Sequence, residues 1–309
     1  MMLRRDGLIG LMILALLFSP LALADTLPGG KVTFPYRPVL GVEHVLDLNL
    51  ETAVAQTVAG HPVVRRQTAE FRLHLKVSSI DKNGAALTAN IVTVKITTQT
   101  PFETVTFDSA TPPAQLDPEL KSLAGLTGRT FRILVTPKGM ATDIKPLPAD
   151  KAADPFGIRR AMRWDDSLAA CLTDLLAIAP PGAVGLQDGW KRNITLPSED
   201  CPLNTPVDLH WVGAKDGAIF LNLAAPVSLA VKNTLSLQTT GKIPVKADLT
   251  TNLSGTVRGE AIYGARDGFI QSAGLYWSLN GTAQRPDGSV PVAVEARLTV
   301  TSDASLQQH

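Results

Sequence analysis

Residues 69–77 alternate strictly between apolar and polar side chains, and this pattern limits the fold more than any other in the sequence. The apolar positions are Ala69, Phe71, Leu73, Leu75 and Val77, and the polar positions between them are Glu70, Arg72, His74 and Lys76. A period of two predicts a strand with one buried face. The turn sequence Asp81-Lys82-Asn83-Gly84 follows, so we expect residues 69–91 to form a β-hairpin with one solvent-exposed face and one buried face.

The same period extends through other parts of the chain. Residues 42–58 read as a long strand, and residues 128–145 read as a second hairpin that turns at Pro137-Lys138-Gly139. In the return strand of the first hairpin the apolar residues change from odd to even positions near Ile91. Either a β-bulge near Ile91 or burial of both faces would produce this change.

Two segments have helical signals instead. Asp117-Pro118 places an N-cap residue before a proline at the first helical position, and Gly125 would end that short helix. Apolar residues recur at helical spacing over residues 154–179, which predicts either one helix or two helices separated by a break near Asp165-Asp166-Ser167. We expect the adjacent carboxylates there to cap a helix, because neighbouring helix positions point about 100° apart and do not form a catalytic pair.

The second half of the chain loosely repeats the first. Leu73-His74 aligns with Leu209-His210 at an offset of 136 positions, although chance similarity between two alternating hairpins would also explain the match. We therefore predict a mainly β protein with a minor helical part, in which two antiparallel lobes are joined by a central helical segment. The expected divisions are a leader at 1–24, an N-terminal lobe at 25–150, a connector at 151–182, a C-terminal lobe at 183–302 and a flexible tail at 303–309.

The first residues have the order of a secretory signal peptide. Arg4 and Arg5 precede an apolar run over residues 8–18, and Ala22-Leu23-Ala24 offers a small-x-small cleavage site. An uncleaved membrane anchor is the alternative, but Ser19-Pro20 interrupts a run that is already short for a spanning helix. We expect export to a periplasm or beyond, with no transmembrane segment after cleavage.

Two segments of the second half support a resemblance to a known family. They are AVGLQDGWKRNITLP at 183–197 and DGFIQSAGLYWSL at 267–279, and the strand starts Gly41-Val42-Glu43 and Gly189-Trp190-Lys191 match each other. The sequence resembles a family of exported bacterial proteins that carry a β-rich domain of unknown function. The resemblance implies a two-part, mostly antiparallel β architecture, and it brings no catalytic residues.

The charge balance and the motifs favour binding over catalysis. Loss of Arg4, Arg5 and Asp6 with the leader reduces 29 basic and 28 acidic residues to 27 of each, so nothing favours nucleic acid as a partner. Nucleophile elbows, phosphate loops and metal-binding histidine motifs are absent from the sequence, and we predict no cofactor, no metal and no enzymatic activity. A catalytic site assembled from distant strands remains open.

Cys171 and Cys201 are the only cysteines. In an oxidising compartment an isolated pair is usually a disulfide, and we expect one here. It would tie the central helix to the start of the second half; redox or metal chemistry is the alternative.

The function depends on what covers the apolar strand faces. The residues of the possible apolar-ligand face are Leu46, Leu48, Leu50, Phe71, Leu73 and Leu75. If the helical segment and the other strands cover them, the protein is a non-catalytic binding or envelope-structural component with an envelope protein as a possible partner. If they surround an unfilled interior, the protein is a carrier of a lipid or other apolar ligand. We favour the binding or envelope-structural protein, because self-burial is the default for an apolar face. A hydrolase is the third candidate.

Overall fold

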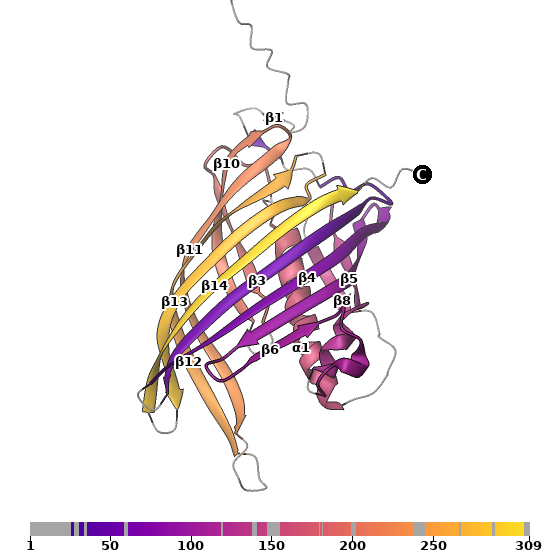
Figure 1. Cartoon of the computed structure of the whole chain (residues 1–309). Coiled ribbons are helices and arrows are strands. Elements are labelled where there is room, and N and C mark those ends of the chain that lie inside the picture. Colours follow the sequence, from indigo (N-terminus) through magenta and orange to yellow (C-terminus); the bar gives the residue numbers. More distant parts are fainter. Residues whose placement is uncertain are drawn as a thin grey trace, which may run out of the picture.

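The computed structural model shows a mainly β protein with long antiparallel strands and one long helix (Figure 1). It describes residues 26–27, 31–33, 36–58, 61–118, 120–137, 141–146, 155–178, 180, 182–198, 202–237, 245–265, 267–285 and 288–305. The strands are β1 (Thr26–Leu27), β2 (Lys31–Val32), β3 (Glu43–Val58), β4 (His61–Asp81), β5 (Gly84–Gln99), β6 (Thr104–Asp108), β7 (Thr130–Val135), β8 (Ala141–Pro146), β9 (Gly189–Leu196), β10 (Leu203–Lys215), β11 (Ala218–Leu237), β12 (Val245–Gly264), β13 (Ile270–Arg285) and β14 (Gly288–Ser305). The helices are the 3₁₀ helices η1 (Pro113–Gln115) and η2 (Lys121–Leu126) and the α-helix α1 (Pro155–Leu176).

Twelve strands form one sheet in the order β8-β7-β5-β4-β3-β14-β13-β12-β11-β10-β9, with β6 beside β5. Strands β3 and β14 pair in the middle of this order, where Leu50 lies opposite Leu298. The two expected lobes are therefore joined as one continuous antiparallel sheet, and the loose duplication is not confirmed. Strand β14 runs to Ser305, past residue 302, where the expected tail would begin.

Helix α1 packs between the two ends of this sheet. It contacts β8 and β9, which lie at opposite ends of the strand order, so the sheet curves around the helix. Figure 1 shows α1 behind β3 and β4. The predicted helical segment forms one continuous helix, so the alternative of two helices with a break near residues 165–167 is wrong, and so is the capping role. Asp165 lies inside the helix and faces Arg129, with 3.1 Å between Oδ2 and Nε.

Side chains from the sheet satisfy the carbonyl groups at the C-terminal end of α1. The Leu175 carbonyl accepts a hydrogen bond from the Tyr263 hydroxyl at 3.0 Å. The carbonyls of Ala177 and Ile178 accept from Arg192 Nε and Trp190 Nε1, each at 2.9 Å. Because the last carbonyls of a helix have no partner within it, these bonds fix the helix end against the sheet.

The alternation in the first hairpin is confirmed. The odd-numbered apolar residues of β4 are buried from Ala69 to Val77, whereas the polar residues between them are exposed or half-buried. The bulge near Ile91 is also confirmed, since Arg72 pairs with Thr93 and Leu73 with Ile91, which leaves Val92 unpaired in β5. One extra residue changes the parity of the side chains that face the core.

The short helix after residue 117 differs from the expectation. Its regular part is the 3₁₀ helix η2, and its N-cap residue is Leu120 with no side-chain hydrogen bond. The Asp117 carbonyl, in place of its side chain, accepts from the Leu120 and Lys121 amides. The carbonyl bonds thus hold this turn without a side-chain cap.

The expected leader at residues 1–24 lies outside the described residues. Among the helices that the structure does describe, none is long and apolar enough to span a membrane.

Candidate functional site

The apolar face that could have held a ligand is filled by the protein itself. Its six residues are between 0 and 2% exposed and belong to one core cluster. Phe71 packs against Trp164 of α1, with 5.2 Å between the ring centroids, and Trp164 is also fully buried. The helix therefore covers the face of β4, as expected for a self-filled interior.

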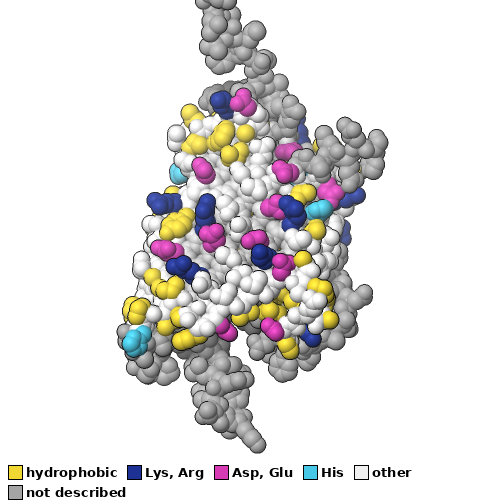
Figure 2. Space-filling model, viewed as in Figure 1, with side chains coloured by type: hydrophobic (Ala, Val, Ile, Leu, Met, Phe, Trp, Pro, Cys, Tyr) yellow, Lys and Arg dark blue, Asp and Glu magenta, His cyan; other side chains and the backbone are white. Residues whose placement is uncertain are grey.

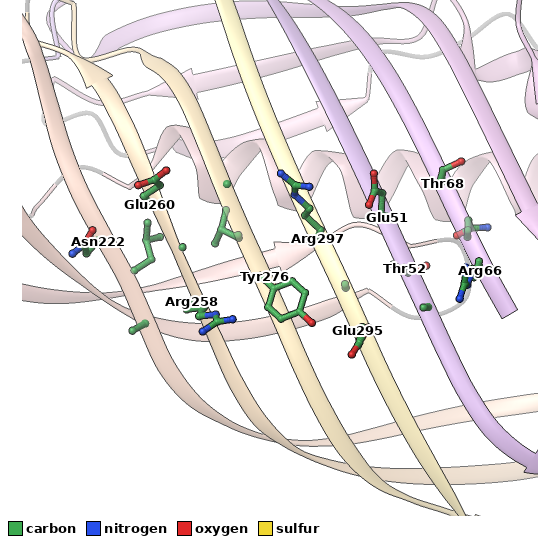
Figure 3. A pocket seen from close by; sticks show the side chains of 18 residues that line it. Glu51, Thr52, Arg66, Thr68, Asn222, Arg258, Glu260, Tyr276, Glu295 and Arg297 are labelled. Atoms are coloured by element: carbon green, nitrogen blue, oxygen red, sulfur yellow. The ribbon is translucent and has the colours of Figure 1, made fainter. Parts of the chain in front are cut away.

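A hollow lies on the opposite, polar face of the sheet. It has a volume of about 1030 Å³ and is lined by residues of β3, β4, β11, β12, β13 and β14. Figure 3 shows its labelled side chains on the near face of the strands, with the helix behind them. We call it the charged hollow, after Glu51, Arg66, Arg258, Glu260, Glu295 and Arg297.

Strand register aligns five of the lining residues in one row. The row runs across five strands as Arg258, Tyr276, Arg297, Glu51 and Thr68, each opposite the next. Directly opposite side chains in antiparallel strands are close enough to interact. Arg258 lies over the Tyr276 ring, with 5.6 Å from its guanidinium carbon to the ring centroid.

The six charged side chains of the hollow form no ion pair with any described residue. A smaller hollow of about 380 Å³ on the same face differs in this respect. There Arg72 binds Asp47 with two contacts of 2.8 Å, and this hydrogen bonding lowers the pKa of the Asp47 carboxyl. Figure 2 shows cationic and acidic side chains intermixed over the front face. In the charged hollow the six charged side chains are exposed.

Three of the histidines differ in burial and in their contacts. His44 stacks on Phe269 with 3.8 Å between ring centroids, and burial lowers its pKa. His74 faces outward with its Nδ1 at 2.8 Å from Glu43, as the parity predicts, and His210 is exposed. No three His, Cys, Asp or Glu side chains among the described residues are grouped to hold a metal ion.

The predicted disulfide is not shown. Cys171 is a free thiol, fully buried on α1, and burial raises its pKa. Cys201 lies outside the described residues.

Two other acids on α1 are buried against neighbouring elements. Burial raises the pKa of Asp165 to about 6 despite the Arg129 charge beside it. Burial likewise raises the pKa of Asp174 to about 6, although its Oδ2 accepts a hydrogen bond of 2.7 Å from the Thr195 amide of β9. Both acids connect α1 to neighbouring parts of the fold.

The residues of the charged hollow were not predicted as a site. Their position on the polar face could be read within each strand: Arg258 and Glu260, for example, lie between the inward-facing residues Val257 and Ala261. Their convergence depends on the pairing of β3 with β14, which the sequence pattern does not indicate.

No family model and no curated protein matches this sequence. Among solved structures, the chain is similar to lipovitellin at a TM-score of 0.45 and 11% identity, over 88% of this chain and 26% of that one. It thus spans about a quarter of the lipovitellin chain. It is also similar to DynF of the dynemicin pathway from Micromonospora chersina, at a TM-score of 0.24, 10% identity and coverages of 90% and 86%. It is similar to OccK7 of Pseudomonas aeruginosa at a TM-score of 0.21 and 9% identity, over 86% of this chain and 99% of that one. At these scores the likenesses define neither the fold nor the function.

Proposed function

We propose that this chain is an exported, non-catalytic binding protein that holds a partner on the charged hollow. The observation that carries the proposal is the set of six charged side chains that line one hollow without an ion pair to any described residue. Exposed charges of both signs at a concave surface give specificity for a partner with a complementary pattern.

Filling of the interior argues against an apolar cargo. An acyl chain bound along Leu48, Phe71 and Leu73 would have to displace side chains that are now almost wholly buried. A well-packed core resists such displacement, because opening it costs both dispersion contacts and apolar burial. The carrier function is therefore the less favoured of the two main candidates.

The chemistry of the lining selects the class of partner. Three carboxylates, Glu51, Glu260 and Glu295, would repel a nucleic acid backbone, and three arginines would be left unpaired by an apolar ligand. The volume lies at the upper end of the range for small-molecule sites. A polypeptide surface that carries both charge signs fits this hollow best, and the half-buried ring of Tyr276 beside Arg258 adds an aromatic contact.

Export is the part of the proposal that rests on sequence. Arg4 and Arg5, the apolar run and the Ala22-Leu23-Ala24 motif support it. Intact-mass measurement of the protein from its host should give a chain that begins at Asp25. A mature chain that still begins at Met1 or Met2 would contradict cleavage.

Site-specific photo-crosslinking in the host tests the hollow. A photoreactive residue in place of Tyr276 should trap a defined partner, whereas the same residue at the exposed Thr104 of β6 should not. Arg297→Glu should abolish the Tyr276 adduct, because it places a second acid opposite Glu51. An equal yield from both crosslinking positions, or an adduct that Arg297→Glu leaves unchanged, would reject the hollow as the binding surface.

A further inference from the structure

Strand β11 has a long edge that pairs with no other described strand. It pairs with β12 along its whole length, from Ala218 opposite Gly264 to Leu237 opposite Val245. Its pairing with β10 ends where Asp208 lies opposite Ala224. Residues 225–237 therefore present one open row of backbone groups.

The edge is open because β10 turns away from it. Residues 203–207 of β10 continue to pair with β9, where Leu203 lies opposite Leu196. Thr205, on this part of β10, accepts a hydrogen bond of 3.2 Å from Trp277 Nε1 of β13, and both side chains are fully buried. This bond and the burial of Val207 hold β10 across the interior and away from β11.

Proline in β11 indicates which backbone groups face the open side. In an antiparallel ladder, successive residues direct their N–H and C=O groups alternately to the two neighbours. Pro226 has no N–H, and proline in a sheet is placed where its nitrogen faces an edge. The even-numbered residues Ser228 and Ala230 therefore point their N–H and C=O groups away from β12. The side chains of Ser228 and Ala230 are exposed, whereas that of Val227, which lies between Pro226 and Ser228, is buried.

We infer that this edge pairs with the same edge of a second copy of the chain. Two β11 edges related by a two-fold axis form an antiparallel pair in which each open N–H meets an open C=O. Pairing between residues of equal parity keeps the polar and the apolar faces continuous across the junction. The two twelve-stranded sheets then join into one.

The charge of the segment fits a second copy. Lys232 is the only charged residue of 225–237. With Val231 on the two-fold axis, Lys232 of each copy lies opposite Ala230 of the other, so the like charges are not paired directly. Edge strands that remain unpaired in natural proteins are usually short or protected by several charges, and this edge is neither.

Light scattering after size exclusion tests the inference on the full mature chain. The wild type should have twice the chain mass and dissociate on dilution. Ala230→Pro should be monomeric and should melt at the temperature of the diluted, monomeric wild type, because it removes an N–H that the monomer does not use. Ser228→Ala, a matched control at the same edge, should remain dimeric.

Hydrogen exchange gives a second test that needs no variant. The outward-facing amides of Ser228 and Ala230 should lose protection on dilution, whereas the amides of residues 218–224, which lie between β10 and β12, should stay protected. A wild type of single-chain mass at all concentrations would overturn the inference. A dimer that survives Ala230→Pro in a folded variant would also do so, because its interface would lie elsewhere.

Discussion

Trp277 of β13 donates its indole N–H to the hydroxyl of Thr205 on β10 at 3.2 Å, across the interior of the curved sheet. The two residues lie three strands apart in the sheet order, and both are fully buried. The bond is thus a polar link between parts of the sheet that are not hydrogen-bonded neighbours.

Thr205→Val should destabilise the fold by about 1 to 3 kcal/mol. The substitution keeps the shape but leaves a buried indole N–H without an acceptor. Urea unfolding followed by Trp fluorescence measures the change. Thr256→Val, at an exposed position of β12, should stay within about half a kcal/mol. Equal effects of the two variants would show that the bond is not important for stability.

Leu73→Ala should cost about 2 to 5 kcal/mol, because the residue is fully buried in the core cluster. His74→Ala, one position along the same strand, should change the free energy of unfolding by no more than about half a kcal/mol. Chemical denaturation of both variants checks the alternation directly. A large loss for His74→Ala would mean that the outward face of β4 contributes to packing.

On acidification, Asp174→Asn should lose more stability than the wild type, or gain less. The pKa of this carboxyl is raised by burial from 3.8 to about 6, so the folded state binds a proton more tightly than the unfolded chain. Its contribution to the free energy of unfolding therefore increases as the pH falls from about 7 to about 4, by about 1 to 3 kcal/mol. Denaturation of wild type and variant over this range should show the difference. Parallel pH curves would contradict the raised pKa.

His44→Phe should have the opposite effect on the pH curve. Burial lowers the pKa of His44, while Asp267 raises it to a smaller extent. The unfolded chain therefore takes up this proton first, and the histidine's contribution to stability is lost as the pH falls through about 6.5. Phenylalanine keeps the stack on Phe269 without a titrating group. The variant should lose less stability than the wild type on acidification. An equal loss in the two proteins would mean that groups other than His44 cause it.

Protein purified from its host should carry no stoichiometric lipid. A ligand that binds only the folded state stabilises it by about 2.7 kcal/mol at a hundredfold excess over its Kd, and this would raise the melting temperature. If the interior is filled, fatty acid does not bind there, and its addition should leave the melting temperature unchanged. Native mass spectrometry and thermal scans measure the two quantities. One bound acyl species per chain, lost in a folded Phe71→Glu variant, would restore the carrier function.

The faces of the strands could be predicted from the sequence, because each face depends on a period of two within one segment. Leu73 inward, His74 outward and the bulge beside Ile91 all follow from residues that are close in the chain. The same local pattern gives the mainly β class.

The single sheet, the unbroken helix and the charged hollow depend on contacts between distant segments. Asp165 can remain inside α1 because Arg129 lies beside it, and no local pattern indicates that partner. Arg297 and Glu51 face each other only because β14 pairs with β3. An alternating pattern specifies which side chains share a face, but it leaves open which strand lies beside which.

The β3–β14 pair also determines when folding can finish. Its partners come from opposite ends of the described chain, from Glu43 opposite Ser305 to Gln56 opposite Val292. Closing so large a loop must precede any gain from the contact, so this pairing slows folding relative to the local hairpins. A chain synthesised from its N-terminus holds β3 without its final neighbour until the last strand has emerged. During that interval the edge of β3 is open to aggregation, and the chain would benefit from a chaperone until β14 arrives.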